Sequence, residues 1–250
     1  MRTPWCFLAV ALALCSTEAA AQTAITEETH IASPQRFAFE LRFGPYDPDV
    51  DEGMPSGSTA CGSGPYNAVF NDETGLMTEL EFDWQPLDIF VGSLGIAGSF
   101  GMFHVTNKAF EEGSCTRSND ETGLWVLPLN LLAVVRFDIL AERWSVPIVP
   151  YFKAGLSYAI WVATDADGIS TADDGSRGYG GSFGLRLAGG LMLLLDWIEP
   201  RAARTFDNEF GVNNSYIFFE YYWAWVDGFG SGNRMNVGDD SWVLGLALEF

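Results

Sequence analysis

The last ten residues alternate strictly between large apolar side chains and small or charged ones. In "SWVLGLALEF", Ser241 to Phe250, every second position is large and apolar, and the positions between them include Gly245, Ala247 and Glu249. Successive side chains of a β-strand point to opposite faces. This stretch therefore predicts a strand with one apolar face and one small or charged face, ending on an aromatic residue.

The same period of two runs through the chain from Arg36 onward, with turn-rich segments between the runs. It predicts eight strands, over residues 36–44, 77–85, 90–104, 123–137, 149–163, 181–195, 215–227 and 240–250. Long polar loops follow strands one, three, five and seven, and two of the other connections are compact. The sixth connection, 196–214, is long. Its Pro200 is followed by helix-tolerant residues, which predicts a short helix between strands six and seven.

Alternation alone fits a soluble barrel with an apolar interior or a membrane barrel with an apolar exterior. The second face of the third strand favours the membrane barrel because it carries small residues that suit a narrow lumen: Ser93, Gly95, Ala97, Ser99 and Gly101. Closure of the barrel also satisfies every backbone group inside a bilayer. The predicted fold is all-β: an eight-stranded antiparallel up-and-down transmembrane β-barrel, with the short helix on its periplasmic side.

Charged residues occupy the second face of the other strands. Six are acidic and four are basic, whereas the whole chain has a net charge of −20. An unpaired buried charge costs several kcal/mol, so this near balance predicts mutual ion pairing in a polar lumen. The predicted lumen charge network comprises Glu40, Arg42, Glu79, Glu81, Asp83, Arg136, Lys153, Arg186, Glu220 and Glu249.

The first 21 residues have the pattern of a secretory signal peptide. Arg2 supplies the charged start, an apolar stretch follows, and Ala19–Ala21 form a small-residue cleavage site. A lipoprotein signal ending at Cys15 is the alternative, disfavoured by the bulky Leu14 directly before it. Residues 22–35 are predicted to be a flexible lead-in, and residues 36–250 a single barrel domain. No later stretch has the 18 apolar residues of a membrane-spanning helix.

Cys61 and Cys115 are the two cysteines that remain after signal cleavage, and they predict a disulfide in an oxidising compartment. The strand assignment places them in the first and second long loops, on the same side of the membrane. Two free thiols are the alternative. Two cysteines and two scattered histidines do not form zinc-ligand pairs, so no metal centre or cofactor is expected from them.

Two further groups of residues are weak candidates for chemistry. Asp47, Asp49 and Asp51 alternate on a loop, as hard-cation ligands do, but solvated acidic loops are the favoured explanation. His104 ends the third strand, where a lipid hydrolase could hold a catalytic histidine. Such an enzyme needs a serine nearby, and no motif selects either Ser99 or Ser114. The acidity of the chain argues against a nucleic acid partner.

Several phrases resemble a family of outer-membrane β-barrel proteins of the myxobacterial type, about residues 37–250. They include "FELRFGPYDPDVDEG", "LMTELEFDWQ" and "GDDSWVLGLALEF". The resemblance implies a small barrel in the outer membrane of a Gram-negative bacterium, and it carries no catalytic motif. Barrels of that membrane commonly end on phenylalanine, which makes Phe250 the candidate insertion signal read by the barrel-insertion machinery.

The predicted function is non-enzymatic, with a structural or surface-interaction role. Outer-membrane lipids and lipopolysaccharide would surround the barrel, and the acidic loops would contact surface protein partners. An even strand number places both termini in the periplasm and the long loops outside. A narrow channel for small solutes is the alternative, and a lipid-modifying enzyme using His104 is the less favoured third hypothesis.

Overall fold

The computed structural model describes residues 36–52, 61–62, 64–111, 114–171, 175–198, 209–232 and 234–250. The signal peptide and lead-in predicted for residues 1–35 lie outside these ranges. The elements are β1 (Phe37–Tyr46), α2 (Pro65–Phe70), β2 (Gly75–Ile89), β3 (Gly92–Phe110), β4 (Arg117–Arg136), α3 (Ile139–Trp144), β5 (Ile148–Asp165), β6 (Gly168–Ile169), β7 (Tyr179–Leu194), β8 (Asn214–Trp225) and β9 (Asp239–Glu249).

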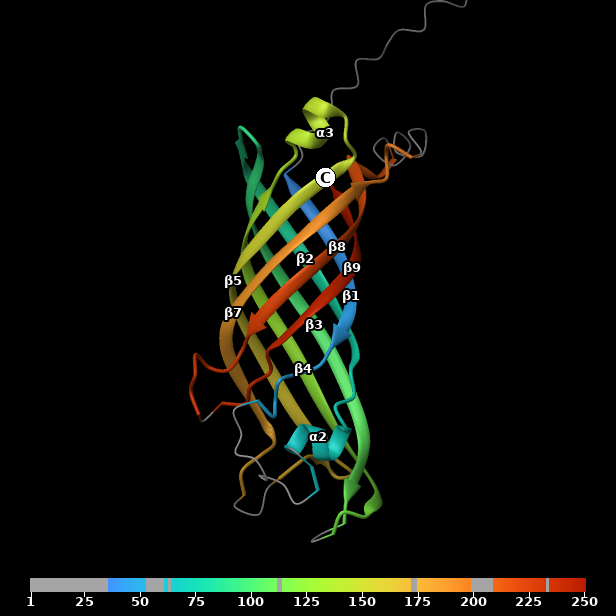
Figure 1. Ribbon diagram of the computed structural model, residues 1–250, viewed down its shortest axis with the longest axis vertical. Coiled ribbons are helices and arrows are strands. Elements are labelled where there is room, and N and C mark those ends of the chain that lie inside the picture. Colours follow the sequence, from blue (N-terminus) through green and yellow to red (C-terminus); the bar gives the residue numbers. More distant parts are fainter. Residues whose placement is uncertain are drawn as a thin grey trace, which may run out of the picture. The chain divides into compact units, whose positions relative to one another are not determined.

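Eight of these strands close into an antiparallel barrel, which confirms the predicted fold (Figure 1). Neighbours along the chain pair around the wall, and β9 pairs with β1 to close it, with Leu248 opposite Phe39. The backbone N–H of Phe250 donates to the carbonyl of Phe37 at 2.8 Å. The final residue is therefore hydrogen-bonded to the start of the first strand. The two-residue β6 pairs only with the end of β5.

The large apolar side chains point out of the barrel. Phe39, Phe82 and Leu131 are 40%, 53% and 58% exposed, whereas the inward-facing Ala97 and Ala247 are fully buried. The alternation in the sequence therefore has the orientation that a bilayer requires, with the apolar face outermost. Within the described ranges, no helix reaches the length and hydropathy needed to span a bilayer.

The two ends of the barrel differ. Four connections, those after β1, β3, β5 and β8, lie at one end together with α2, while α3 and the C-terminus lie at the other (Figure 1). We call these the loop end and the terminal end. At the loop end, β3 and β4 continue beyond their predicted limits as a paired hairpin, as far as Phe110 opposite Arg117.

The structure describes short helices at two positions that the sequence did not predict. They are α2, between β1 and β2, and α3, between β4 and β5. Most of the connection in which a helix was predicted, residues 199–208 between the sixth and seventh strands, lies outside the described ranges, and Glu209 and Phe210 at its end are helical. A six-residue helix is too short to show helical periodicity, which needs a window of about 11–18 residues.

Candidate functional site

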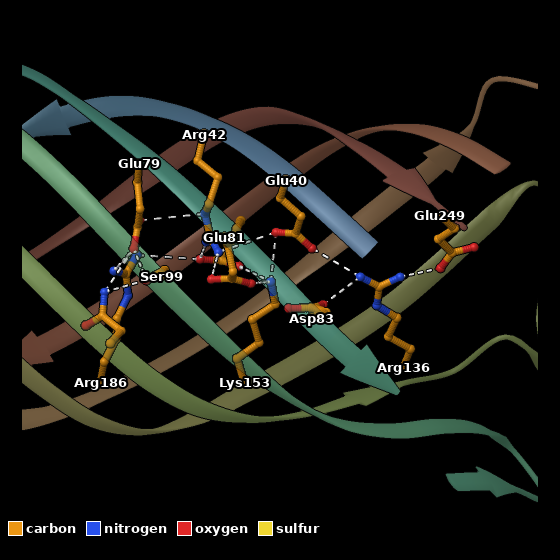
Figure 2. A network of polar contacts seen from close by, with 12 residues as sticks. Glu40, Arg42, Glu79, Glu81, Asp83, Ser99, Arg136, Lys153, Arg186 and Glu249 are labelled. Carbon is orange, nitrogen blue, oxygen red and sulfur yellow. Dashed lines mark hydrogen bonds and ion pairs between the residues drawn. The ribbon is translucent and has the colours of Figure 1, made fainter. Parts of the chain in front are cut away.

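All ten charged residues of the predicted lumen network point into the barrel and are buried. They come from seven strands, because each occupies the inward position of the local alternation: β1, β2, β4, β5, β7, β8 and β9. Figure 2 labels these residues, apart from Glu220, and shows them in one continuous chain of contacts along the interior. The network is therefore assembled by closure of the barrel and not by any single segment.

Arg42 lies at the centre of this network. Its guanidinium is ion-paired with Glu81 and Glu220, and lies 3.4 Å from Glu40 and 3.7 Å from Glu79. The planar guanidinium offers five N–H donors, which is why one arginine can face four carboxylates. The side chain is completely buried.

Two further cations extend the network toward the terminal end. Arg136 bonds Asp83 at 2.8 Å and Glu40 at 3.1 Å, and is also ion-paired with Glu249 on the last strand. Lys153 contacts Glu40 at 2.8 Å and is ion-paired with Glu81. Each of these carboxylates therefore has at least one cationic partner.

Arg186 completes the network on the other side of Arg42. Its two terminal nitrogens lie 2.9 and 3.1 Å from the two carboxylate oxygens of Glu79, a bidentate pair. Ser99 and Asn130 also donate to Glu79, at 2.6 and 2.9 Å. The sequence analysis assigned Ser99 to the lumen face without a partner and did not include Asn130. The sequence did offer a signal for Asn130: it lies between Leu129 and Leu131, which face outward, so the alternation places Asn130 in the lumen.

Three carboxylates of the network could meet around a metal ion by distance alone. Suitable oxygens of Glu40, Glu81 and Asp83 lie within 4.8 Å of one another. Arg42, Arg136 and Lys153 already place positive charge against them. The arrangement therefore has the character of a structural charge network, in which the basic side chains take the place of a cation.

Apolar clusters occupy the lumen on both sides of the charges, and at the terminal end a cavity of about 390 Å³ stays open beside Gln85, Tyr216 and Glu249. At the loop end, Tyr46, Tyr66, Phe70, Phe103 and Val126 belong to one buried cluster, which includes residues of α2. At the terminal end, a second cluster contains the following residues: Val149, Tyr151, Met192, Tyr216, Phe218 and Ala247. In the described part of the lumen, a cavity of about 20 Å³ lies between the loop-end cluster and Arg186. A space of that size holds roughly one water molecule.

The loop end is fastened by polar contacts and a covalent bond. The Asp51 carboxylate accepts the N–H groups of Tyr66 and Asn67 at 2.8 and 2.7 Å, at the start of α2. Arg117 of the β3–β4 hairpin donates to the Val69 carbonyl at 2.7 Å, near the end of α2. The structure also contains the predicted disulfide between Cys61 and Cys115.

The three aspartates predicted as a weak cation-site candidate, Asp47, Asp49 and Asp51, lie in different local environments. Asp51 holds α2, as described above, and is therefore occupied by backbone donors. Burial, followed by the negative charges of Glu52, Asp240 and Asp47, raises the pKa of Asp49 to about 6. Burial likewise raises the pKa of Asp47. The geometry gives Asp51 a structural role and, in the part of the loop that the structure describes, offers no second feature that points to a bound cation.

His104 and the two candidate serines do not come together. The imidazole of His104 lies on the outer surface, stacked on the ring of Trp125 at a centroid distance of 3.9 Å. Ser99 faces the lumen and donates to Glu79, while Ser114 lies beside Cys115 beyond the hairpin strands. Residues 99 and 104 differ by an odd number, so the alternation itself places them on opposite faces of β3.

No protein-family model and no curated protein matches the sequence. Solved structures with a similar fold include Ail of Yersinia pestis in complex with sucrose octasulfate, at 13% identity, with 86% of this chain and 97% of that chain covered and a TM-score of 0.42. The N-terminal β-barrel domain of Pseudomonas aeruginosa OprF is 13% identical, with 86% and 98% covered and a TM-score of 0.41.

A major outer membrane protein of Thermus thermophilus is 12% identical, with 87% of this chain and 100% of that chain covered and a TM-score of 0.41. The similar structures are thus β-barrels of outer-membrane type. The narrower resemblance to the myxobacterial family stays a prediction.

Proposed function

We propose that the protein is a non-enzymatic outer-membrane β-barrel with a structural or surface-interaction role. The observation that carries this proposal is the combination of an apolar outer wall with a filled interior. Exposed side chains such as Phe82 and Leu131 would cost free energy in water and would be solvated by lipid tails. Outer-membrane lipids and lipopolysaccharide are the corresponding surroundings.

The filling of the lumen supports a non-conducting barrel. An ion or solute would have to pass the cluster around Phe103, the ion pairs of Arg42, and the cluster around Phe218. An eight-stranded barrel is just wide enough for its own side chains. The narrow channel for small solutes is the alternative proposal, supported by the small residues inside β3, such as Gly95 and Gly101.

Single-channel recording in planar bilayers tests this proposal. We expect the purified protein to insert without a stable open pore, because the charge network and the apolar clusters fill the lumen. A matched variant, Tyr46→Ala with Phe103→Ala, removes aromatic bulk from the loop-end cluster and should still show no steady conductance while Arg42 keeps its partners. Large, stable openings of the unmodified protein would contradict the proposal and favour the channel.

The loop end is the part of the molecule suited to an interaction. We propose that it faces the cell exterior and that both termini face the periplasm. In this orientation α2, the disulfide and the β3–β4 hairpin form a fastened platform, and the acidic loops give it a negative charge for contacts with surface proteins. Insertion would follow from recognition of the last strand and Phe250 by the barrel-insertion machinery.

A lipid-modifying enzyme using His104 is the third and weakest proposal. Its support is the outward position of His104 near the loop end. Replacement of His104 by Ala, followed by mass spectrometry of envelope lipids, tests it. Unchanged lipids would dispose of the enzyme, whereas accumulation of an uncleaved lipid would favour it over the structural role.

A further inference from the structure

The outward face of β3 is interrupted at one residue. Its outward positions carry Leu94, Ile96, Phe100 and Met102, but the position between Ile96 and Phe100 is Gly98. A Cβ atom placed on Gly98 would meet no other atom within 4 Å. The wall therefore has a notch where every neighbouring position has a large apolar side chain.

The strand register extends this notch into a groove. One row of paired positions crosses the wall through Phe39, Phe82, Gly98, Leu131 and Leu156. A second row runs beside it through Leu80, Phe100, Leu129, Tyr158 and Phe183. All ten residues line one outer cavity of about 550 Å³. We call this cavity the Gly98 groove.

The groove is long and narrow. It crosses from β1 to β7, which is five strand spacings of about 4.8 Å each, or roughly 24 Å. Its two rows of side chains lie two residues apart along each strand, which is about 7 Å. An α-helix with its side chains is about 10–12 Å in diameter, which is wider than this spacing. An extended hydrocarbon chain fits this shape.

The groove also lies at the middle of the barrel. Ala97 and Ser99, on either side of Gly98, point inward, and Ser99 touches Glu79 of the charge network. The side chains of both rows are apolar apart from the hydroxyl of Tyr158. At this depth a membrane barrel is surrounded by lipid tails and not by head groups.

We propose that the Gly98 groove is a binding site for one acyl chain of a membrane lipid. Gly98 is the residue that leaves it open, and Tyr158 and Phe183, with ring centroids 4.4 Å apart, form its end at β7. The inference rests on the proposed placement of the barrel in a membrane. It goes beyond that placement because it assigns an ordered lipid chain to one face of a wall that is otherwise uniformly apolar.

Photo-crosslinking in vesicles tests the site. The full mature protein is reconstituted into phosphatidylethanolamine vesicles that contain a phospholipid with a diazirine at mid-chain, and labelled peptides are located by mass spectrometry. We expect labelling to concentrate on peptides containing Phe100 and Leu131. In Gly98→Leu it should fall to less than about a third, because the new side chain takes the space of the lipid contacts.

Gly189→Leu is the matched control. Gly189 also faces outward, on β7, and a Cβ there meets its nearest atoms at 3.8 Å and 3.9 Å, so a side chain is accommodated. This variant should leave the labelling of the Gly98 groove unchanged. Labelling that is equal in Gly98→Leu and the unmodified protein would overturn the inference, as would protein–protein crosslinks at the groove that point to a second copy.

The same experiment separates this inference from the proposed function. Even labelling of the whole outward wall, insensitive to Gly98, would overturn the groove site while leaving the membrane barrel intact. An absence of lipid labelling on every outward strand would overturn the membrane placement itself, and the groove site with it.

Discussion

Cys61 and Cys115 are joined by a disulfide across 54 residues of chain, with their Cα atoms 5.4 Å apart. The bond connects the segment before α2 to the tip of the β3–β4 hairpin. Two loops that rise from different hairpins are thereby held together at one end of the barrel.

We expect the double variant Cys61→Ser, Cys115→Ser to be less stable than the unmodified protein. A cross-link closing a loop of this length is worth up to about 4 kcal/mol in the chain-entropy model. Urea unfolding of the folded protein in detergent micelles measures the difference. Reduction of the unmodified protein should reproduce it, and equal unfolding midpoints for oxidised and reduced protein would show that the bond restrains nothing.

Removal of the central cation should be strongly destabilising. Arg42→Met keeps much of the side-chain volume but leaves Glu81 and Glu220 without their principal partner, and breaking a buried pair costs about 3–5 kcal/mol. Lys108→Met, at an exposed position, is the matched control and should unfold like the unmodified protein. Denaturant unfolding compares the three proteins. Similar midpoints for Arg42→Met and the control would mean that the carboxylates tolerate the loss.

The alternation of residues carries most of the information about this fold. It specifies which residues share a face, so the inward position of Glu40, Lys153 and Glu249 follows from counting along each strand. It does not specify which partners meet. Arg42 is opposite Glu79 in the β1–β2 register, yet it also pairs with Glu220 of β8, which is not a neighbouring strand. That contact depends on closure across the lumen.

Other features of the fold leave no period-two pattern in the sequence. The β3–β4 hairpin continues through polar residues. Asn107 of β3 pairs with β4, and Glu121 of β4 pairs with β3, but this part of the hairpin has no apolar face that the sequence pattern could reveal. In α2, Pro65 at the first turn is a helix-start signal, but the segment is too short for periodicity to identify it. The Gly98 groove is visible only when the registers of several strands are combined.

The loop end should become more stable on mild acidification. The pKa of Asp49 in the folded protein, about 6, is above its ordinary value of 3.8 because of burial and nearby negative charge. Its contribution to stability is therefore fully present below pH 3.8 and is lost as pH rises through about 6. Protection of loop-end amides from hydrogen exchange should decrease as pH rises through about 6, after correction for intrinsic rates. Asp49→Asn should remove that dependence, and an unaltered pH profile in this variant would contradict the assignment.

Antibody access to epitope tags on intact cells can establish which end of the barrel faces the cell exterior. Gly168, the first residue of β6, lies at the loop end, and Ser145, directly after α3, lies at the terminal end. If the loop end faces outward, an epitope tag inserted at Gly168 should bind antibody on intact cells, because an antibody does not cross the outer membrane. A tag at Ser145 should bind only after the cells are permeabilised. Both tagged proteins must first show the same barrel folding in extracts, which rules out misfolding as the cause of a missing signal. Antibody binding to Ser145 and not to Gly168 on intact cells would reverse the proposed orientation and transfer the surface-interaction role to α3.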